Sequence, residues 1–417
     1  MPAISRCLCV VLLFAFIQSA KANSDPFKPY LKRVPLVVKI ISEVNSGTGT
    51  SAITTRKFTF ASRDGRDTVY AIMAFPQQSG IYPGIMFLHG GGSKAEDMLH
   101  RVEDYAREGY VTMAFDMPGI CNSTTTPNSS GAWKSKPGGE TPRFDIASSV
   151  ENSTLVDAEV AGLQAFNYLT SQKNVDDKNI GITGFSWGGY STTMLAGLLG
   201  NRIKAAYAVF GCGFYDQGSF WMKIISALPS KERNTWLKYF DAGRRAGHIK
   251  APYFLDAASN DTYFWPEAVT NTLAAIPGNK NHLWGPNYNH RQMPNGGNMQ
   301  HLYFNYYLKG IGKPFGEASI VTDKLQQDSS KKIVIKVDMP VGVAPDSVLL
   351  YYCERNTTWQ LRKWIPIESK KNTDQLYDVI IPAELVKKGI DYYGYITDDR
   401  KVAVSTAMYY QSTQAIH

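Results

Sequence analysis

The sequence Gly-Phe-Ser-Trp-Gly-Gly at residues 184–189 constrains the fold of this chain more than any other feature. It follows an apolar, strand-like run at residues 179–183 and precedes a helical run at residues 190–199. Only small residues can flank a serine on so sharp a turn, which accounts for the glycines on either side of it. The pattern predicts that the turn lifts the Ser186 hydroxyl above the end of a sheet, at the N-terminus of a helix.

Short apolar runs alternate with helix-like segments on both sides of this turn. Strands are predicted at residues 85–88, 110–115, 179–183, 203–210, 252–257 and 281–284. Helices are predicted at residues 93–109, 154–170 and 298–308, the first opened by a capping box of Ser93 and Glu96. Three more strands precede them, at residues 35–44, 53–61 and 68–74. Strands that alternate with helices predict a mostly parallel sheet covered on both faces.

Residues 120–150 interrupt this alternation with a stretch rich in Ser, Thr, Pro, Gly and Asn. A long irregular segment inside a compact domain is usually functional or mobile. Because it follows a strand whose end should face the site, we expect it to form a wall of a cleft that determines substrate choice.

The pattern changes again near residue 319, where side chains alternate between apolar and polar. Strands are predicted at residues 331–337, 347–352, 377–381, 392–396 and 402–408. Short strands separated by turns predict a β-sandwich of the immunoglobulin or fibronectin kind, although the Cys–Trp–Cys signature is absent. We therefore expect a catalytic domain over residues 23–318 and a second domain over residues 319–417, whose aromatic side chains mostly face its own core.

The first 22 residues have the features of a secretory signal peptide. Arg6 precedes an apolar run, and Ala-Lys-Ala at residues 20–22 supplies a cleavage pattern. We expect cleavage after Ala22 and a secreted or periplasmic protein. No later stretch approaches the ~20 apolar residues of a membrane span.

Composition limits the partners of the chain. The formal net charge is +8, but no block of Lys and Arg concentrates it, which argues against nucleic-acid binding. Cys121, Cys212 and Cys353 follow the predicted leader, and this odd number leaves at least one thiol unpaired or paired between chains. Their spacing fits no metal site, and no motif indicates a cofactor. The oligomeric state is left open.

A serine hydroxyl becomes a nucleophile when a base takes its proton and a carboxylate orients that base. In folds of this kind these residues follow the serine in the order acid, then histidine. Asp261 lies just past the strand at residues 252–257, where a parallel sheet gathers functional groups, and is the preferred acid. Asp216, after the preceding strand, and Asp256, inside the strand, are the alternatives.

The base is expected in a loop after the last strand of the sheet. His290 follows the strand at residues 281–284 and fits this position. His282 begins that strand, where a structural role is more usual, and His301 belongs to the terminal helix. His290 is therefore the preferred base.

An oxyanion needs two backbone N–H donors held in place before the reaction. Trp187, directly after the nucleophile, supplies one. The other is expected from the loop His-Gly-Gly-Gly at residues 89–92, with Gly91 as first choice and Gly90 as second. His89 is expected to brace this loop rather than to react.

These motifs resemble the acetylxylan-esterase and dienelactone-hydrolase-like proteins of bacteria. The His-Gly-Gly-Gly loop, Asp-Met-Pro-Gly at 116–119, the serine turn and Ser-Asn-Asp at 259–261 carry the resemblance, which covers roughly residues 60–315. It implies an α/β-hydrolase fold, a mostly parallel central sheet flanked by helices, with an immunoglobulin-like sandwich following. It also implies Ser186, Asp261 and His290 as the triad. Dienelactone hydrolases proper carry a Cys nucleophile, so Ser186 favours the esterases.

The resulting hypothesis is a serine carboxylic-ester hydrolase that acts on a small ester or an acetylated polysaccharide. A peptidase of the prolyl-oligopeptidase type is the first alternative, but about 60 residues before the hydrolase motifs leave no room for its propeller. A catalytically silent hydrolase fold used for binding is the second. The Asn-x-Ser/Thr sequons are taken as chance or surface composition, because a glycan on Asn260 would obstruct the site.

Overall fold

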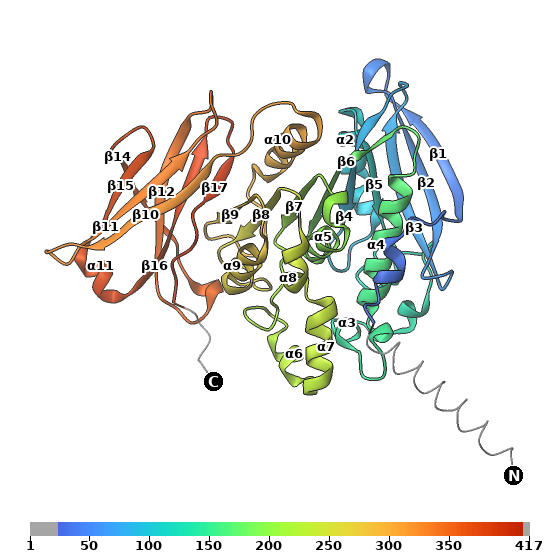
Figure 1. Cartoon of the computed structure of the whole chain (residues 1–417), viewed down its shortest axis with the longest axis horizontal. Coiled ribbons are helices and arrows are strands. Elements are labelled where there is room, and N and C mark those ends of the chain that lie inside the picture. Colours follow the sequence, from blue (N-terminus) through green and yellow to red (C-terminus); the bar gives the residue numbers. More distant parts are fainter. Residues whose placement is uncertain (1–23, 412–417) are drawn as a thin grey trace, which may run out of the picture.

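A twisted nine-stranded sheet forms the centre of the larger part of the molecule (Figure 1). The computed structural model describes residues 24–411, so the predicted leader at residues 1–22 lies outside the described residues. The strand order is β1-β2-β3-β5-β4-β6-β7-β8-β9. The strands are β1 (Val38–Ser46), β2 (Ile53–Ser62), β3 (Asp67–Pro76), β4 (Tyr82–Leu88), β5 (Val111–Phe115), β6 (Val175–Phe185), β7 (Ala205–Val209), β8 (Tyr253–Ala258) and β9 (Lys280–Gly285).

The six neighbouring strands β5-β4-β6-β7-β8-β9 run parallel to one another. Strands β1, β2 and β3 form an antiparallel meander at the far edge. Parallel strands all end at the same edge of a sheet, so the loops after β4, β6, β8 and β9 converge there. Every strand predicted before residue 285 is present, and the predicted mostly parallel sheet is confirmed.

Helices cover both faces of the sheet, as the alternation of strands and helices predicted. The principal helices are α2 (Leu99–Arg107), α4 (Thr154–Leu169), α5 (Trp187–Leu199), α7 (Ser230–Phe240), α9 (Pro266–Ala275) and α10 (Gly296–Lys309). A Cβ at Gly181 would meet Phe304 of α10, whereas one at Gly84, paired with Ile180, would meet Leu169 of α4. Adjacent strand residues point to opposite faces, so α10 and α4 lie on opposite sides.

The start of the first predicted helix differs from the prediction. The chain enters through a 3-10 turn, η3 (Ala95–Met98), so the capping acid is Asp97, whose carboxylate accepts from Ser93 Oγ at 2.6 Å and Lys94 N at 3.1 Å. Glu96 instead accepts from Lys57 Nζ at 2.8 Å. The Ser93–Glu96 capping box is therefore wrong, because the tighter turn shifts the cap by one residue and Glu96 has a cationic partner on β2.

Two four-stranded antiparallel sheets follow the last helix and form the predicted β-sandwich, visible as the orange and red strands of Figure 1. One sheet has the order β10-β11-β15-β14 and the other β13-β12-β16-β17. A Cβ at Gly394 would lie 3.3 Å from Ile335 Cδ1, so the two sheets pack face to face. The strands are β10 (Glu317–Leu325), β11 (Lys331–Asp338), β12 (Pro345–Glu354), β13 (Ile365–Glu368), β14 (Lys370–Lys371), β15 (Leu376–Ile381), β16 (Ile390–Asp398) and β17 (Ala403–Ser405).

Strands β10, β13 and β14 were not predicted. They are largely exposed, so their sequences carry little of the apolar alternation that marks a half-buried strand. β10 begins at Glu317, two residues before the predicted boundary at residue 319.

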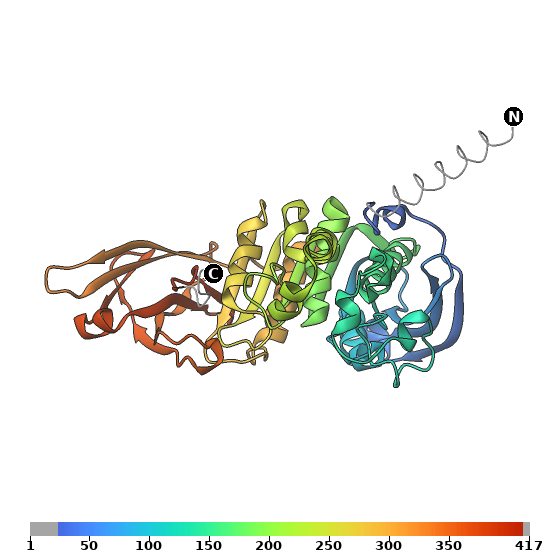
Figure 2. The same ribbon diagram turned by 90° about the horizontal axis from the view of Figure 1, so that it is seen from below.

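The sandwich joins the nine-stranded sheet at its β9 edge (Figure 2). The amide of Trp284 in β9 donates to Ser405 Oγ of β17 at 2.9 Å. His282 Nε2 lies 3.1 Å from the Thr406 carbonyl, so this histidine has the structural role expected of it.

All three cysteines of the described residues are buried and unbridged. Burial raises the pKa of the Cys121 and Cys353 thiols to about 12, so both are protonated and unreactive at neutral pH. Within residues 24–411 no helix combines the length and apolar character needed to span a bilayer. The same residues contain no cluster of three side chains suited to hold a metal ion.

Candidate active site

Ser186 occupies a strained turn between β6 and α5. Its backbone has φ +57° and ψ −118°, a conformation that residues other than glycine rarely adopt. A Cβ at Gly184 would lie 2.3 Å from the Gly188 carbonyl oxygen, and one at Gly188 would lie 2.1 Å from the Leu88 carbonyl oxygen. Both positions therefore exclude any side chain, as the spacing of glycines around the serine indicated.

The structure brings Ser186, His290 and Asp261 together in one hydrogen-bonded chain. His290 Nε2 lies 2.9 Å from Ser186 Oγ, and His290 Nδ1 lies 3.0 Å from Asp261 Oδ2. The three residues come from the loops that follow β6, β9 and β8, at the shared carboxyl edge of the parallel strands. Such spacing allows a proton to pass from the hydroxyl to the imidazole, with the carboxylate holding the ring.

The Asp261 carboxylate is buried but satisfied. Its Oδ1 accepts from the amides of Tyr263 at 2.7 Å and Phe264 at 3.1 Å, in addition to its contact with His290. The amides fix the plane of the carboxylate, so Asp261 in turn fixes the orientation of the imidazole.

Aromatic rings enclose the imidazole of His290. The ring centroids of Tyr263 and Phe210 lie 4.7 and 4.9 Å away, and Phe264 stacks at 6.0 Å. The residue itself has φ +44°, a backbone conformation that is uncommon for residues other than glycine. Packing against these rings and the contact with Asp261 hold the imidazole toward the serine.

The alternative acids are engaged elsewhere. Both carboxylate oxygens of Asp216 accept from Arg244, at 2.9 and 2.8 Å. Asp256 Oδ2 accepts from Gln292 at 2.7 Å and from Tyr207 at 3.2 Å, and burial raises its pKa to about 6. Asp261 is therefore the candidate acid that lies beside His290.

His301 and His89, the other histidines near the site motifs, have structural partners. His301 lies 3.0 Å from Glu108 and stacks on Tyr105. Burial lowers the pKa of His89 to about 4, so its ring is neutral. Its Nε2 accepts from the Met117 amide at 2.9 Å, and its Nδ1–H therefore donates to the Gly90 carbonyl at 2.8 Å. His89 braces the glycine loop, as predicted.

The glycine loop leaves two candidate oxyanion donors. Gly92 N donates to the Ile120 carbonyl at 2.8 Å, whereas among the described residues no hydrogen bond occupies the amides of Gly90, Gly91 and Trp187. A Cβ at Gly91 would lie 2.8 Å from Trp187 Cδ1, and one at Gly90 would lie 3.6 Å from Ser186 Cβ. Both loop glycines thus lie beside the serine turn, and both stay candidates.

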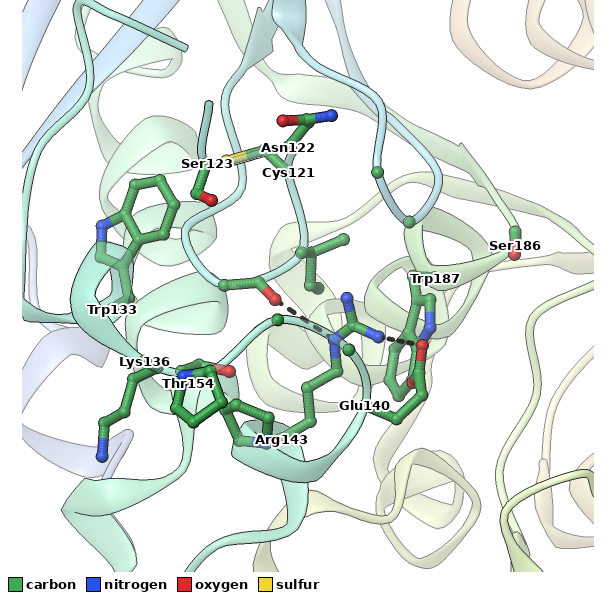
Figure 3. A pocket seen from close by; sticks show the side chains of 18 of the residues that line it. Cys121, Asn122, Ser123, Trp133, Lys136, Glu140, Arg143, Thr154, Ser186 and Trp187 are labelled. Atoms are coloured by element: carbon green, nitrogen blue, oxygen red, sulfur yellow. Dashed lines mark hydrogen bonds and ion pairs between the residues drawn. The ribbon is translucent and has the colours of Figure 1, made fainter. Parts of the chain in front are cut away.

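A cavity of about 580 Å³ opens in front of Ser186, and residues 119–143 form one of its walls (Figure 3). Figure 3 shows the ion pair of Arg143 and Glu140 beside Trp187. The Arg143 guanidinium is buried 4.5 Å from the Trp187 ring, and Trp221 Nε1 donates to Glu140 at 2.9 Å. The irregular segment thus lines the cleft, as its position predicted. No pattern in the sequence predicted that Arg143 pairs with Glu140.

A second cavity of about 400 Å³ also reaches Ser186 and His290. Its other lining is mainly apolar and includes Leu88, Met98 and Phe185. The serine therefore lies between a mixed polar and aromatic cavity and an apolar one.

The fold and site together define an α/β-hydrolase. Residues 69–282 match the model of the dienelactone hydrolase family, and the chain belongs to this family. The resemblance drawn from the motifs is therefore confirmed.

Related proteins include esterases. The acetyl esterase Axe7A of Xylanibacter ruminicola is 24% identical over 214 residues, which are 48% of this chain and 47% of that protein. The chain thus matches about half the length of this curated relative. Acetyl xylan esterase 1 of a Thermoanaerobacterium species is 17% identical, with a TM-score of 0.56 over 69% of this chain and 93% of its own. An acetyl xylan esterase of a Paenibacillus species is 20% identical, with a TM-score of 0.56 over 68% and 93%. These two structures share the fold.

Proposed function

We propose that this protein is a serine carboxylic-ester hydrolase that works through an acyl-enzyme. The observation that carries the proposal is the continuous chain of contacts from the Asp261 carboxylate through His290 to the Ser186 hydroxyl. No cofactor or metal ion is needed for this chemistry, because the imidazole supplies the base and the backbone supplies the charge stabilisation.

In the first half-reaction His290 Nε2 takes the proton of Ser186 as Oγ attacks the ester carbonyl carbon. The oxyanion that forms accepts hydrogen bonds from the amides of Trp187 and of Gly91 or Gly90. When the tetrahedral intermediate collapses, the alcohol leaves with the proton held by His290, and the acyl group stays on Ser186. Water then attacks the acyl-enzyme with His290 again as base, which releases the acid and restores the hydroxyl.

The proposed substrate class is an acetylated carbohydrate or a small ester. The cavity in front of Ser186 presents Trp221 and Tyr263 together with polar groups of Lys136 and Glu140, a combination that suits a sugar alcohol. The relatives named acetyl esterase and acetyl xylan esterase support an acetyl group as the acyl part.

The proposal includes a leader at residues 1–22, a catalytic domain at residues 23–318 and a β-domain at residues 319–417. A protein that acts on extracellular polysaccharide would be exported, so we place it outside the cytoplasm, secreted or periplasmic. Mass spectrometry of the exported protein should find Asn23, the residue after Ala22, at the N-terminus. An intact Met1 on active exported protein would contradict the leader.

The test of the activity is labelling with a fluorophosphonate combined with a substrate panel. The wild-type protein should be labelled at Ser186, and Ser186→Ala should lose both the label and the activity. The panel comprises acetylated xylan, feruloyl esters, p-nitrophenyl esters of short acids and peptide amides. Absence of labelling would indicate a silent hydrolase fold, and faster cleavage of amides than of esters would indicate a peptidase.

A further inference from the structure

Residues 359–364 of the β-domain, here called the strap, lie against the loops that carry Asp261 and His290. The strap begins with the 3-10 turn η8 (Trp359–Leu361) and ends where β13 begins. Gln360 Nε2 donates to the backbone carbonyl of Asp261 at 2.9 Å. A side chain 99 residues further along the chain therefore contacts the proposed catalytic acid directly.

The residue before the acid is also fixed by the strap. Asn260 Nδ2 donates to the carbonyls of Trp359 at 3.1 Å and Arg362 at 2.7 Å. The Asn260 side chain is buried, so both bonds are shielded from water. The same burial leaves no room for a glycan on the Asn260 side chain in the folded protein.

The loop of the proposed base is held by the other end of the strap. Asn287 Oδ1 accepts from Trp364 N at 2.8 Å, while Asn287 Nδ2 donates to the Trp364 carbonyl at 2.8 Å. Asn287 has φ +63°, and His290 three residues later has φ +44°. Positive φ values at residues other than glycine persist only where surrounding contacts hold them. The paired bonds to Trp364 are such contacts.

The strap is itself fixed by contacts with its surroundings. The Arg362 guanidinium lies 3.4 Å from the Trp359 ring and forms a buried ion pair with Asp391 of β16. Trp359 Nε1 donates to Glu267 Oε2 of helix α9 at 2.9 Å. A buried ion pair with its remaining bonds satisfied resists displacement, so the strap can hold the two loops in place.

Shielding of an apolar face does not account for these contacts. The strap uses hydrogen bonds to particular atoms of residues 260, 261 and 287, rather than apolar surface alone. Trp359 and Trp364 are too buried to contact a sugar, because only 1% and 2% of their surfaces are exposed. No strap residue lines either of the two cavities at Ser186.

We infer that the strap positions the Asp261–His290 pair for catalysis, with Gln360 as a positioning residue that acts through Asp261. The inference rests on the proposed function, which assigns Asp261 and His290 as acid and base. Removal of the Gln360 bond frees the Asp261 peptide, and misplacement of a catalytic group by about 1 Å can cost ~100-fold in rate. Because one of several strap bonds is lost, we expect kcat to fall about tenfold.

The experiment compares full-length Gln360→Ala and Gln360→Glu with a matched control. The Glu variant keeps the size of the side chain but removes its donor when ionised. The control is Asn295→Ala, because Asn295 Nδ2 donates to the Lys401 carbonyl at 2.6 Å across the same domain junction without touching Asp261. The readouts are kcat and KM on p-nitrophenyl acetate and the melting temperature.

Both Gln360 variants should lose kcat with KM unchanged, whereas Asn295→Ala should stay within about twofold of wild type. In an Asp261→Asn background the Gln360 substitutions should cost nothing further, because they act through the missing carboxylate. Wild-type kcat in both variants, or an undiminished loss in that background, overturns the inference. High activity of Asp261→Asn alone would instead overturn the proposed function, so the two failures are distinguishable.

Discussion

The serine turn and the loops of the acid and base are stabilised in different ways. Ser186 is held by its chain neighbours and the adjoining strands: Gly184 and Gly188 leave the space, and its amide donates to the Val209 carbonyl at 2.9 Å. The loops of Asp261 and His290 also have local contacts, but they are held in addition by partners between 77 and 102 residues further along the chain, in the β-domain. The nucleophile of the proposed triad is thus positioned within the hydrolase sheet, whereas the loops of the other two residues also form hydrogen bonds with the strap.

Replacing the nucleophile should have the largest effect. Ser186→Ala should lower kcat by ~10⁶-fold, because removing a triad nucleophile leaves only binding and the oxyanion hole. The melting temperature should stay close to that of the wild type, since the Cβ and the turn are retained. Steady-state rates on p-nitrophenyl acetate and a thermal scan check both points. A variant with more than a tenth of the wild-type rate would show that Ser186 is not the nucleophile.

Replacing the acid tests the residue whose backbone carbonyl accepts a hydrogen bond from the strap. Asp261→Asn should lower kcat by ~10⁴-fold with little change in melting temperature, because the amide favours the wrong tautomer of His290. Asp216→Asn is the control, and it should be mild because Asp216 pairs with Arg244. The measurement is kcat of both variants on p-nitrophenyl acetate, together with their melting temperatures. The reverse result would place the acid after β7.

The wall at residues 119–143 should affect substrate binding rather than the reaction step, in contrast to the strap. Glu140→Gln weakens the ion pair that holds Arg143 beside Trp187. We expect KM for acetylated xylan to rise about fivefold while kcat stays the same, since uniform binding is lost. KM for p-nitrophenyl acetate should change little. An equal change on both substrates would mean that the wall does not discriminate between large and small esters.

Replacing a buried glutamate that contacts the helix after the nucleophile should change stability alone. Glu159 of α4 is fully buried and accepts a hydrogen bond from Ser191 of α5, and burial raises its pKa to about 8. The unfolded chain ionises this group near its usual pKa of 4.5. The stability gained from the protonated form is therefore complete below pH 4.5 and is lost as the pH rises to about 8.

Glu159→Gln should remove this dependence, which has a maximal slope of about 1.4 kcal/mol per pH unit. The measurement is the melting temperature of both proteins between pH 4.5 and pH 8. Catalysis at pH 7 should stay unchanged, because Glu159 does not line either cavity. Parallel pH profiles of stability would show that Glu159 ionises normally in the folded state.

Local patterns in the sequence predicted much of the fold. Helix α4 was expected at residues 154–170 and spans Thr154–Leu169, because its apolar residues lie within one segment. The glycines at residues 184 and 188 indicated the serine turn for the same reason. The Ser93–Glu96 cap was wrong because Lys57, far away in sequence, binds Glu96.

The site was predictable where chain order carries information. Asp261 and His290 follow consecutive strand ends, so the parallel sheet brings them to one edge, and their selection needed only the order of strands. The pairing of Arg143 with Glu140 had no such signal, because charged residues in an irregular segment have many possible partners. The contact of Gln360 with Asp261 was equally hidden, since a half-exposed Gln on a loop resembles any surface residue.

The sequence alone determined the serine turn, the alternation of strands and helices, and the β-sandwich, because each depends on steric and hydrophobic rules that act between near neighbours. Only the tertiary structure decided which atoms hold the acid and base in place. Hydrogen bonds such as that from Gln360 to the Asp261 carbonyl depend on how the β-sandwich packs against the edge of the nine-stranded sheet. Docking brings together side chains whose separation along the chain carries no periodic signal.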